Sequence, residues 1–564
     1  MAKLPLTKPD LNFTENPMNK PLTLATLSLL TAAASAQVVP SGFRADNVVT
    51  GLTQPTVMEF IGPTRFLVCE KGTGRVKHYL NNTLQNVSLD LNVANNSERG
   101  LLGMCLDPNF AQNNFVYLYY SNAATDGGTW LDNRVEKFVW DGTNLTFSQT
   151  LIVFPFDGAQ GNGPNHDGGI IMIGPDQKLY IITGDLNRNR LEQNQSSTAI
   201  AGVGAVHRIN LDGTIPSDNP FFSHSNPMVK TYYAYGVRNS YGLTFDPVTN
   251  FIWDTENGPS NYDEINPILP GFNSGWNKLM GPDSRNSLNA SDLVYLPGAY
   301  YSDPVFSWLS TIAPTALKFV DTYQFGGDEF RNLFVGDANF GNLYLFTMDP
   351  SRTAFIYKPG TEDRVADTTA EQNLYRWGSS LGSVTDIEIG PDKFIYIVSL
   401  GNGRITRIKP VDVVAAAESY TLIRGALAGG TIASLHGPDD DRLSLRRGVV
   451  LANEAPISIQ TTATASVAST TQLELVVESF STHTGIPQKV ELLNQQTGQF
   501  ETLINNTTTT SETATSVVVT TNPNRFINSG NRQVVIRASY GPPTASQAGK
   551  FVISLDRLFV KVRE

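Results

Sequence analysis

The stretch GPDQKLYIITGD, residues 174–185, decides the fold: a Gly-Pro turn leads into a run of alternating apolar β-formers. This order is typical of a β-strand that leaves a tight turn. The same unit, or a near relative of it, begins at Gly62, Asp107, Gly174, Asp246, Gly327 and Gly390. Such units cannot bury their faces alone, and radial closure buries them without long exposed edges. We therefore predict an all-β chain in which residues 37–412 form a six-bladed β-propeller.

The rest of the chain follows a different β pattern. Runs such as QLELVVESFS (472–481) and RQVVIRASY (532–540) are separated by Thr, Asn, Gly and Pro turns and lack the aromatic Gly-Pro unit. This pattern predicts a smaller C-terminal β-sandwich over residues 420–564. Because no motif for chemistry occurs in it, we expect this part to attach the protein to an envelope or extracellular matrix.

Composition excludes several classes of protein. The 564 residues carry 41 Lys and Arg against 52 Asp and Glu, a net charge of −11, without the cationic stripe that nucleic-acid binding requires. The two cysteines, Cys69 and Cys105, are too few for a disulfide-rich scaffold or a Cys-based metal centre. They either pair as a disulfide in an oxidising compartment or remain two buried thiols.

The N-terminal region predicts export. From Met18 the sequence reads MNKPLTLATLSLLTAAASAQ, with a positive Lys20, a short apolar run and an A-x-A ending at Ala36. These are the three parts of a secretory signal peptide, which we place at 18–36, with residues 1–17 upstream of the true start. The apolar run is too short to span a bilayer, so we expect a secreted or periplasmic protein with no membrane span.

One segment carries the elements of a general base. His166, in NHDGG, opens the third repeat unit and Asp185 closes it. An imidazole that is oriented by a carboxylate is prepared to remove a proton. The alternative is a histidine in a polar surface turn.

Two further segments bring polar groups together. Arg238 and Asn239 lie in the Gly-flanked stretch YGVRNSYGL, where an arginine would polarise an oxygen or tie down a loop. ENGPSNYDEIN, residues 256–266, combines carboxylates, amides and Gly-Pro carbonyls, the oxygen-rich set that calcium prefers. An Asx-rich turn is the alternative for this last segment.

Together with SERGLLGMCLDPNF (97–110), these three segments resemble the glucose/sorbosone dehydrogenase family over residues 40–410. Members are secreted six-bladed propellers related to the soluble quinoprotein glucose dehydrogenases and aldose sugar dehydrogenases. The resemblance implies pyrroloquinoline quinone (PQQ) over the propeller axis, together with calcium. It makes His166 the general base, Asp185 the carboxylate that orients it, and Arg238, with Asn239 beside it, the contact to the quinone oxygens.

The resemblance also assigns the calcium loop. Gly258 and Pro259 match the residues whose carbonyls hold the cofactor calcium. Asn257 falls where the family often has Gln, and Asp263 matches a nearby acid of the cofactor site. Glu264 falls where a structural calcium ligand is expected.

This sequence departs from the family at the carboxylates of PQQ, which the better-known enzymes clamp with a lysine and two arginines. Aligning VGDANFGNLYLF (335–346) puts Asn339 at the lysine position, and aligning GSVTDIEIGPD (382–392) puts Ser383 and Thr385 at the arginine positions. Three cations are thus replaced by neutral groups. Charge-assisted bonds to a carboxylate contribute roughly 1.5–3 kcal/mol each, so weaker PQQ binding is expected.

The implied function is oxidation of an aldose sugar at its anomeric carbon, with hydride transfer to the quinone. The alternative is a non-catalytic secreted propeller that binds a glycan or a protein partner. The sequence identifies neither the sugar nor the electron acceptor.

Overall fold

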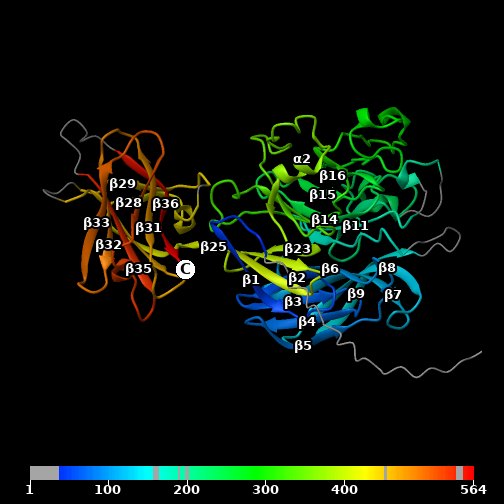
Figure 1. Ribbon diagram of the computed structural model, residues 1–564, viewed down its shortest axis with the longest axis horizontal. Coiled ribbons are helices and arrows are strands. Elements are labelled where there is room, and N and C mark those ends of the chain that lie inside the picture. The colour runs from blue at the N-terminus through cyan, green and yellow to red at the C-terminus, as the bar shows by residue number, and fades with distance from the viewer. Residues whose placement is uncertain are drawn as a thin grey trace, which may run out of the picture. The chain divides into compact units, whose positions relative to one another are not determined.

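The computed structural model describes residues 37–155, 164–187, 191–196, 202–437, 439–449, 454–541 and 551–564. The predicted signal peptide lies outside the described residues. Nearly all regular structure is β (Figure 1), with short helices at α1 (Phe110–Asn113) and α2 (Thr369–Leu374). No helix in the described part of the chain is long and apolar enough to cross a membrane.

Six antiparallel sheets follow one another along residues 43–410. The first three are β2 (Pro55–Gly62), β3 (Arg65–Glu70), β4 (Arg75–Leu80) and β5 (Thr83–Asp90); β6 (Leu101–Leu106), β7 (Phe115–Ala123), β8 (Trp130–Trp140) and β9 (Leu145–Pro155); and β10 (Ile171–Ile173), β11 (Lys178–Thr183), β12 (Ala205–Asn210) and β13 (Tyr232–Tyr235). The fourth is β14 (Ser240–Phe245), β15 (Ile252–Glu256), β16 (Asn261–Ile268) and β17 (Phe306–Ser310), to which β21 (Val365–Ala366) adds in parallel. The last two are β18 (Pro314–Phe319), β19 (Leu333–Asp337), β20 (Leu343–Phe346) and β22 (Arg376–Gly378), then β23 (Val384–Ile389), β24 (Ile395–Ser399), β25 (Arg404–Pro410) and β1 (Phe43–Thr50).

The ring of sheets is closed by the two ends of the propeller sequence. β1 pairs antiparallel with β25, so the first strand of the chain becomes the outermost strand of the sixth sheet. The innermost strands contact each other in the cycle β2, β6, β10, β14, β18, β23 and back to β2. The predicted six-bladed β-propeller is therefore confirmed.

The repeat unit that identified the propeller encodes the turn between the first two strands of a sheet. The hydroxyl of Tyr180 on β11 donates to the turn carboxylate of Asp176 at 3.0 Å, and Tyr396 on β24 donates to Asp392 at 2.8 Å. A Cβ at Gly174 would lie 2.8 Å from ring atoms of both Tyr180 and Phe245, so a side chain there would force packed rings to move. In these two units the turn acid and the tyrosine of the following strand thus stabilise the same tight turn.

A β-sandwich follows the propeller. One sheet has the order β28 (Ala426–Gly429), β29 (Leu443–Arg446), β36 (Val552–Arg563), β31 (Leu473–Ser481) and β34 (Thr513–Val519), with β26 (Asp412–Ala415) also paired to β36. The other has the order β27 (Ala417–Arg424), β30 (Ile457–Thr464), β35 (Gln533–Tyr540), β32 (Pro487–Asn494) and β33 (Gln499–Thr507).

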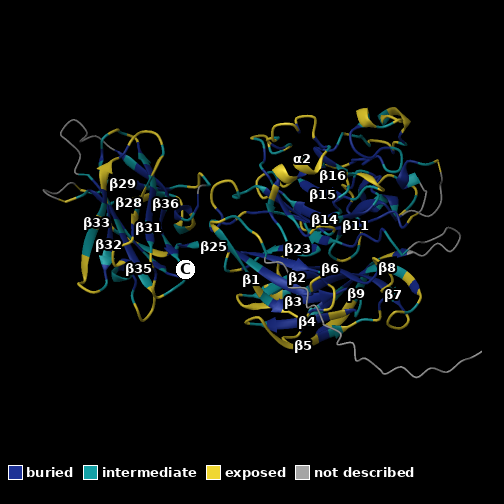
Figure 2. Cartoon of the chain, viewed as in Figure 1, coloured by how far each residue is buried: buried dark blue, intermediate teal, exposed yellow. Residues whose placement is uncertain are grey.

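Side chains from both sheets form the core of the sandwich. Leu475 on β31 and Ile536 on β35 belong to the same buried cluster. Figure 2 colours the buried residues of the sandwich strands dark blue. Sheet membership changes between Pro410 and Asp412, so the predicted start of the sandwich at residue 420 falls inside β27. The thiols of Cys69 and Cys105 are both free and buried in the propeller, so the alternative of two buried thiols holds.

Candidate functional site

A cavity of about 410 Å³ lies at the centre of the ring. Each of the six sheets contributes to its wall through at least one residue: Lys71, Leu102, Gly168, Tyr241, Thr315 and Thr385. Of the residues that the sequence singled out, the cavity is also lined by His166, Arg238, Asn239 and Asn257. The predicted base and the predicted arginine therefore face one cavity.

His166 and Asp185 form a close pair in the wall of this cavity. His166 Nδ1 lies 2.6 Å from Asp185 Oδ1, and both residues are buried. The backbone N–H of Asn187 donates to the same carboxylate oxygen at 2.7 Å. His166 Nε2 has no hydrogen-bond partner among the described residues. The carboxylate thus holds one ring nitrogen and leaves the other for a ligand in the cavity.

Glycines allow the backbone to bring this pair together. His166 itself has φ 63°, in the left-handed region, and Gly168 has the same φ. A Cβ at Gly184 would lie 2.2 Å from the carbonyl oxygen of His166, so only glycine permits this approach. The NHDGG and TGD motifs are therefore two separate loop segments that pack closely against each other, and the glycines permit that contact.

Glu98 is a functional candidate that our sequence reasoning missed. Its Oε2 accepts the backbone N–H of His166 at 2.7 Å and the side-chain amide of Asn239 at 3.1 Å. Lys71 supports the same loop, because its ammonium donates to the carbonyls of Ser97 at 2.7 Å and Arg99 at 2.9 Å. The acid in SERGLLG was the available signal for Glu98.

Arg238 lies at the cavity with part of its hydrogen-bonding capacity unused. Its Nη1 donates to the carbonyl of Asn257 at 2.8 Å, and its guanidinium lies 5.3 Å from the ring centroid of Trp276. Burial lowers the pKa of Arg238. Arg238 Nε and Asn257 Oδ1 are buried and have no hydrogen-bond partner within the described structure. Since buried polar atoms are normally paired, this donor and this acceptor are available to a ligand that can form hydrogen bonds.

The predicted calcium loop follows Asn257 but does not line the cavity. The carbonyl oxygens of Gly258 and Pro259 accept no hydrogen bond from the residues that the structure describes. Asp263 braces this loop: Oδ1 accepts the N–H of Gly258 at 2.8 Å, and Oδ2 accepts the N–H groups of Ile312 at 2.6 Å and Ala313 at 2.8 Å. Burial raises the pKa of Asp263 to about 6. Its carboxylate therefore serves the loop rather than the cavity.

Glu264 is buried on β16, away from the cavity lining. Its carboxylate accepts the N–H of Gly281 and, at 3.3 Å, the amide of Asn266. Within the described ranges no group of three or more His, Cys, Asp or Glu side chains is placed to hold a metal ion. The structural calcium ligand at Glu264 therefore stays a prediction.

The cavity wall from the fifth and sixth sheets is neutral. Thr385 lines it, but its hydroxyl donates to the carbonyl of Pro55 at 3.1 Å. Ser383 donates to the carbonyl of Ala338 at 2.9 Å and does not line the cavity. At the predicted lysine position the lining residue is Ala338, whereas Asn339 is exposed. Among the described lining residues, no cation comes from these two sheets.

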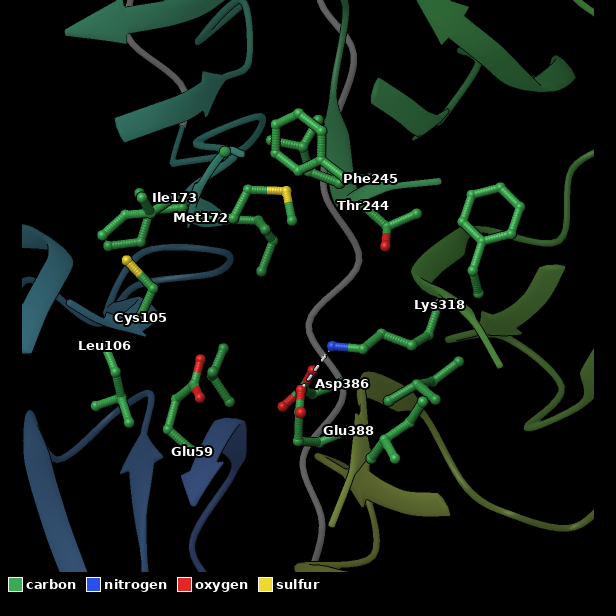
Figure 3. Close-up of a pocket in the computed structure, with 18 of the residues that line it drawn as sticks. Glu59, Cys105, Leu106, Met172, Ile173, Thr244, Phe245, Lys318, Asp386 and Glu388 are labelled. Atoms are coloured by element: carbon green, nitrogen blue, oxygen red, sulfur yellow. Dashed lines mark hydrogen bonds and ion pairs between the residues drawn. The ribbon is translucent and has the colours of Figure 1, made fainter. Parts of the chain in front are cut away.

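A second cavity, of about 660 Å³, lies further along the same innermost strands (Figure 3). Its charged residues lie on β2, β18 and β23, apart from Asp321, which follows β18. Lys318 Nζ approaches Glu388 Oε2 to 2.8 Å. Burial, together with repulsion from Glu388, raises the pKa of both Glu59 and Asp386, the latter to about 7. None of the predicted site residues lies in this cavity.

Asp386→Asn is expected to stabilise the protein at alkaline pH. The folded-state pKa of about 7 lies above the ordinary value, so the stability due to this carboxyl is greatest in acid and is lost as the pH rises through 7. The amide can still accept the N–H of Met58, which lies 2.9 Å from Asp386 Oδ2. We expect a gain on the order of 1–3 kcal/mol at pH 8.5 and a small change at pH 5.

Calorimetric melting of the propeller at the two pH values measures this. Asp90→Asn serves as the control, because it removes the same charge from a half-exposed ion pair with Arg75. An exposed pair contributes little, so that variant should shift neither melting curve by much. A gain at pH 5 as large as that at pH 8.5 would contradict the assignment to Asp386 ionisation.

Comparison with known proteins agrees with this architecture. A family model described as Glucose / Sorbosone dehydrogenase matches residues 52–407, more than half of the chain. Quinoprotein glucose dehydrogenase B of Acinetobacter calcoaceticus is 28% identical over 292 residues, which are 46% of this chain and 59% of that protein. The aldose sugar dehydrogenase YliI of Escherichia coli (strain K12) is 24% identical over 388 residues, 68% of this chain and 97% of that protein.

A solved structure of a glucose dehydrogenase-type oxidoreductase from Thermus thermophilus is 26% identical, with a TM-score of 0.52. The match covers 65% of this chain and the whole of that one. The matched part is the propeller, which contains the cavity and all the residues that line it. The chain therefore belongs to the glucose/sorbosone dehydrogenase family.

Proposed function

We propose that this chain is an exported dehydrogenase that uses PQQ and calcium to oxidise an aldose sugar at its anomeric carbon. The observation that carries the proposal is the His166–Asp185 pair, 2.6 Å apart, in the wall of a cavity that Arg238 also lines. Family membership supports a sugar oxidoreductase. The names of two relatives, a quinoprotein glucose dehydrogenase and an aldose sugar dehydrogenase, support the quinone and the aldose.

The residues present fit the quinone end of PQQ. Arg238 Nε and Asn257 Oδ1 are buried and unpaired within the described structure, so each offers a hydrogen bond to a ligand rich in oxygen. The free carbonyls of Gly258 and Pro259 are hard oxygen ligands of the kind that calcium accepts. When bound, PQQ supplies the two-electron acceptor that the side chains themselves lack.

The chain's own residues can accept the proton of the sugar hydroxyl and stabilise the negative charge that develops in the reaction. Asp185 accepts a hydrogen bond from Nδ1–H of His166, which leaves Nε2 unprotonated and free to take the proton of the sugar's anomeric hydroxyl. The guanidinium of Arg238, fixed by Asn257 and buried, stabilises negative charge that develops on an oxygen beside it. Leu102, Ala313 and Leu400 make part of the wall apolar, which keeps water from competing.

Reconstitution tests this function. The mature chain, from Gln37, is mixed with PQQ and calcium, and the quinone absorbance and the reduction of an artificial electron-accepting dye are followed with glucose, other aldoses and sorbosone. We expect saturable PQQ binding and sugar-dependent dye reduction. Absence of saturable binding at tens of micromolar PQQ would reject the proposal.

One observation favours a second candidate, a non-catalytic propeller that binds a glycan or a protein partner. Among the described residues, the cavity wall from the fifth and sixth sheets offers no cation to the carboxylates of PQQ. In either case we propose that the signal peptide at 18–36 directs export and that the sandwich attaches the protein to an envelope or matrix. Binding to glycans without PQQ binding would favour this second candidate.

A further inference from the structure

We infer that Trp276 is a positioning residue that holds Asp185 and Arg238 in place for proton removal at His166. The inference rests on the proposed function. Trp276 belongs to the loop between β16 and β17 and was not singled out by the sequence. Trp276 contacts both Asp185, which orients the base, and Arg238.

The first contact completes the hydrogen bonding of Asp185. The indole N–H of Trp276 donates to Asp185 Oδ2 at 2.7 Å, across 91 residues of sequence. The other oxygen, Oδ1, is held by His166 Nδ1 and by the N–H of Asn187. Both carboxylate oxygens are thus fixed, and the plane of the carboxylate determines the direction of the imidazole.

The second contact places Arg238. Its guanidinium lies over the indole ring, 5.3 Å from the ring centroid, at a distance typical of a cation–π interaction. The loop cannot drift away from this position, because Trp276 N donates to the carbonyl of Gly236 at 3.0 Å and Trp276 O accepts the amide of Asn194 at 2.7 Å. Trp276 is therefore tied to the turn that leads into Arg238.

The indole bond also affects the basicity of the imidazole. A donor on Asp185 Oδ2 withdraws charge from the carboxylate, so the carboxylate stabilises the imidazolium of His166 less than it otherwise would. The other charged groups near His166 are Glu98, which accepts its backbone N–H, Asp167, Arg238 and Lys71, which lines the same cavity. None of these loses a contact when only the indole N–H is removed.

Trp276→Phe removes the indole N–H and keeps a ring under Arg238. We expect the acid limb of the kcat profile to move to higher pH, since the freed carboxylate holds the imidazolium more strongly. Looser placement of the carboxylate should lower kcat about tenfold, with little change in KM.

The matched control is Trp377→Phe, which also removes an indole–carboxylate hydrogen bond, from Trp377 to Glu329 at 3.0 Å, outside the cavity lining. Histidine NMR on the full mature chain reads the pKa of His166 directly; the protein has six histidines, and His166→Asn assigns the signal. We expect the shift in Trp276→Phe and none in Trp377→Phe.

An unchanged His166 pKa in a folded Trp276→Phe variant would overturn the inference. Should that variant not fold, the indole N–H signal of Trp276 in the unaltered protein decides: it must follow the titration of His166, and a signal indifferent to that titration rejects the coupling. Because NMR needs no turnover, an inactive protein with the expected shift would reject the proposed function and leave the role of Trp276 intact.

Discussion

His166→Ala is expected to lower kcat by about 10³–10⁴-fold, because a positioned general base contributes up to about that factor. Nε2 is the atom that receives the proton, and no second base within the described cavity wall is held by a carboxylate as His166 is. PQQ affinity should stay nearly unchanged, since the quinone end is expected to meet Arg238 and Asn257 instead.

The variant needs a companion because His166 has φ 63°. Alanine is strained in this region, whereas asparagine tolerates it, so His166→Asn separates the loss of the base from backbone strain. Both variants should lose turnover, and only the alanine variant should have a lower melting temperature than the unaltered protein. His224→Ala, outside the cavity, is the control and should keep full activity. A fully active His166→Asn would refute the assigned base.

The propeller was predictable because its signal is local. Each repeat carries its own turn residues and its own run of alternating apolar β-formers, so six copies could be recognised without knowing any long-range contact. In two of them the turn acid also binds a tyrosine of the following strand, Asp176 with Tyr180 and Asp392 with Tyr396. The strand that closes the ring could not be predicted in this way. β1 pairs with β25 across more than 350 residues, and nothing in the local pattern of FRADNVVT points to that partner.

The residues of the candidate site likewise fall into two groups, those that local motifs predict and those that depend on long-range contacts. His166 and Arg238 lie in motifs whose glycines indicate tight turns in the backbone, and both residues face the cavity. Glu98 and Trp276 act through contacts that cross from one sheet to another, at separations of 68 and 91 residues. Such contacts depend on the geometry of the ring, which the residues themselves do not reveal.

The alignment also left an error of one residue at the position where the family has a PQQ-binding lysine. Alignment placed it at Asn339, whereas the cavity is lined by Ala338. Both residues follow β19, where the backbone bends, so an offset of one residue exchanges a side chain that lines the cavity for one that faces solvent. Asn339 is indeed exposed. The neutral character of the wall is unaffected, but the residue on which to test it changes.

Ala338→Lys is therefore expected to tighten PQQ binding by about 10–100-fold, the equivalent of one charge-assisted bond to a carboxylate. The backbone at this position is already fixed, since Ala338 N donates to the carbonyl of Ala313 at 2.9 Å and Ala338 O accepts from Ser383. A lysine there extends from a held backbone into the cavity. Titration of quinone absorbance against protein, with calcium present, measures the change.

Two neighbouring variants separate charge from size and from place. Ala338→Gln fills the same space without a charge and should leave the affinity within a few-fold. Asn339→Lys adds the same charge on an exposed residue outside the cavity lining and should act only through screened, long-range attraction. If Asn339→Lys tightened binding and Ala338→Lys did not, the cavity wall would be misassigned by one residue. If neither did, the carboxylates of PQQ would not face the fifth sheet, and the neutral wall would serve a different ligand.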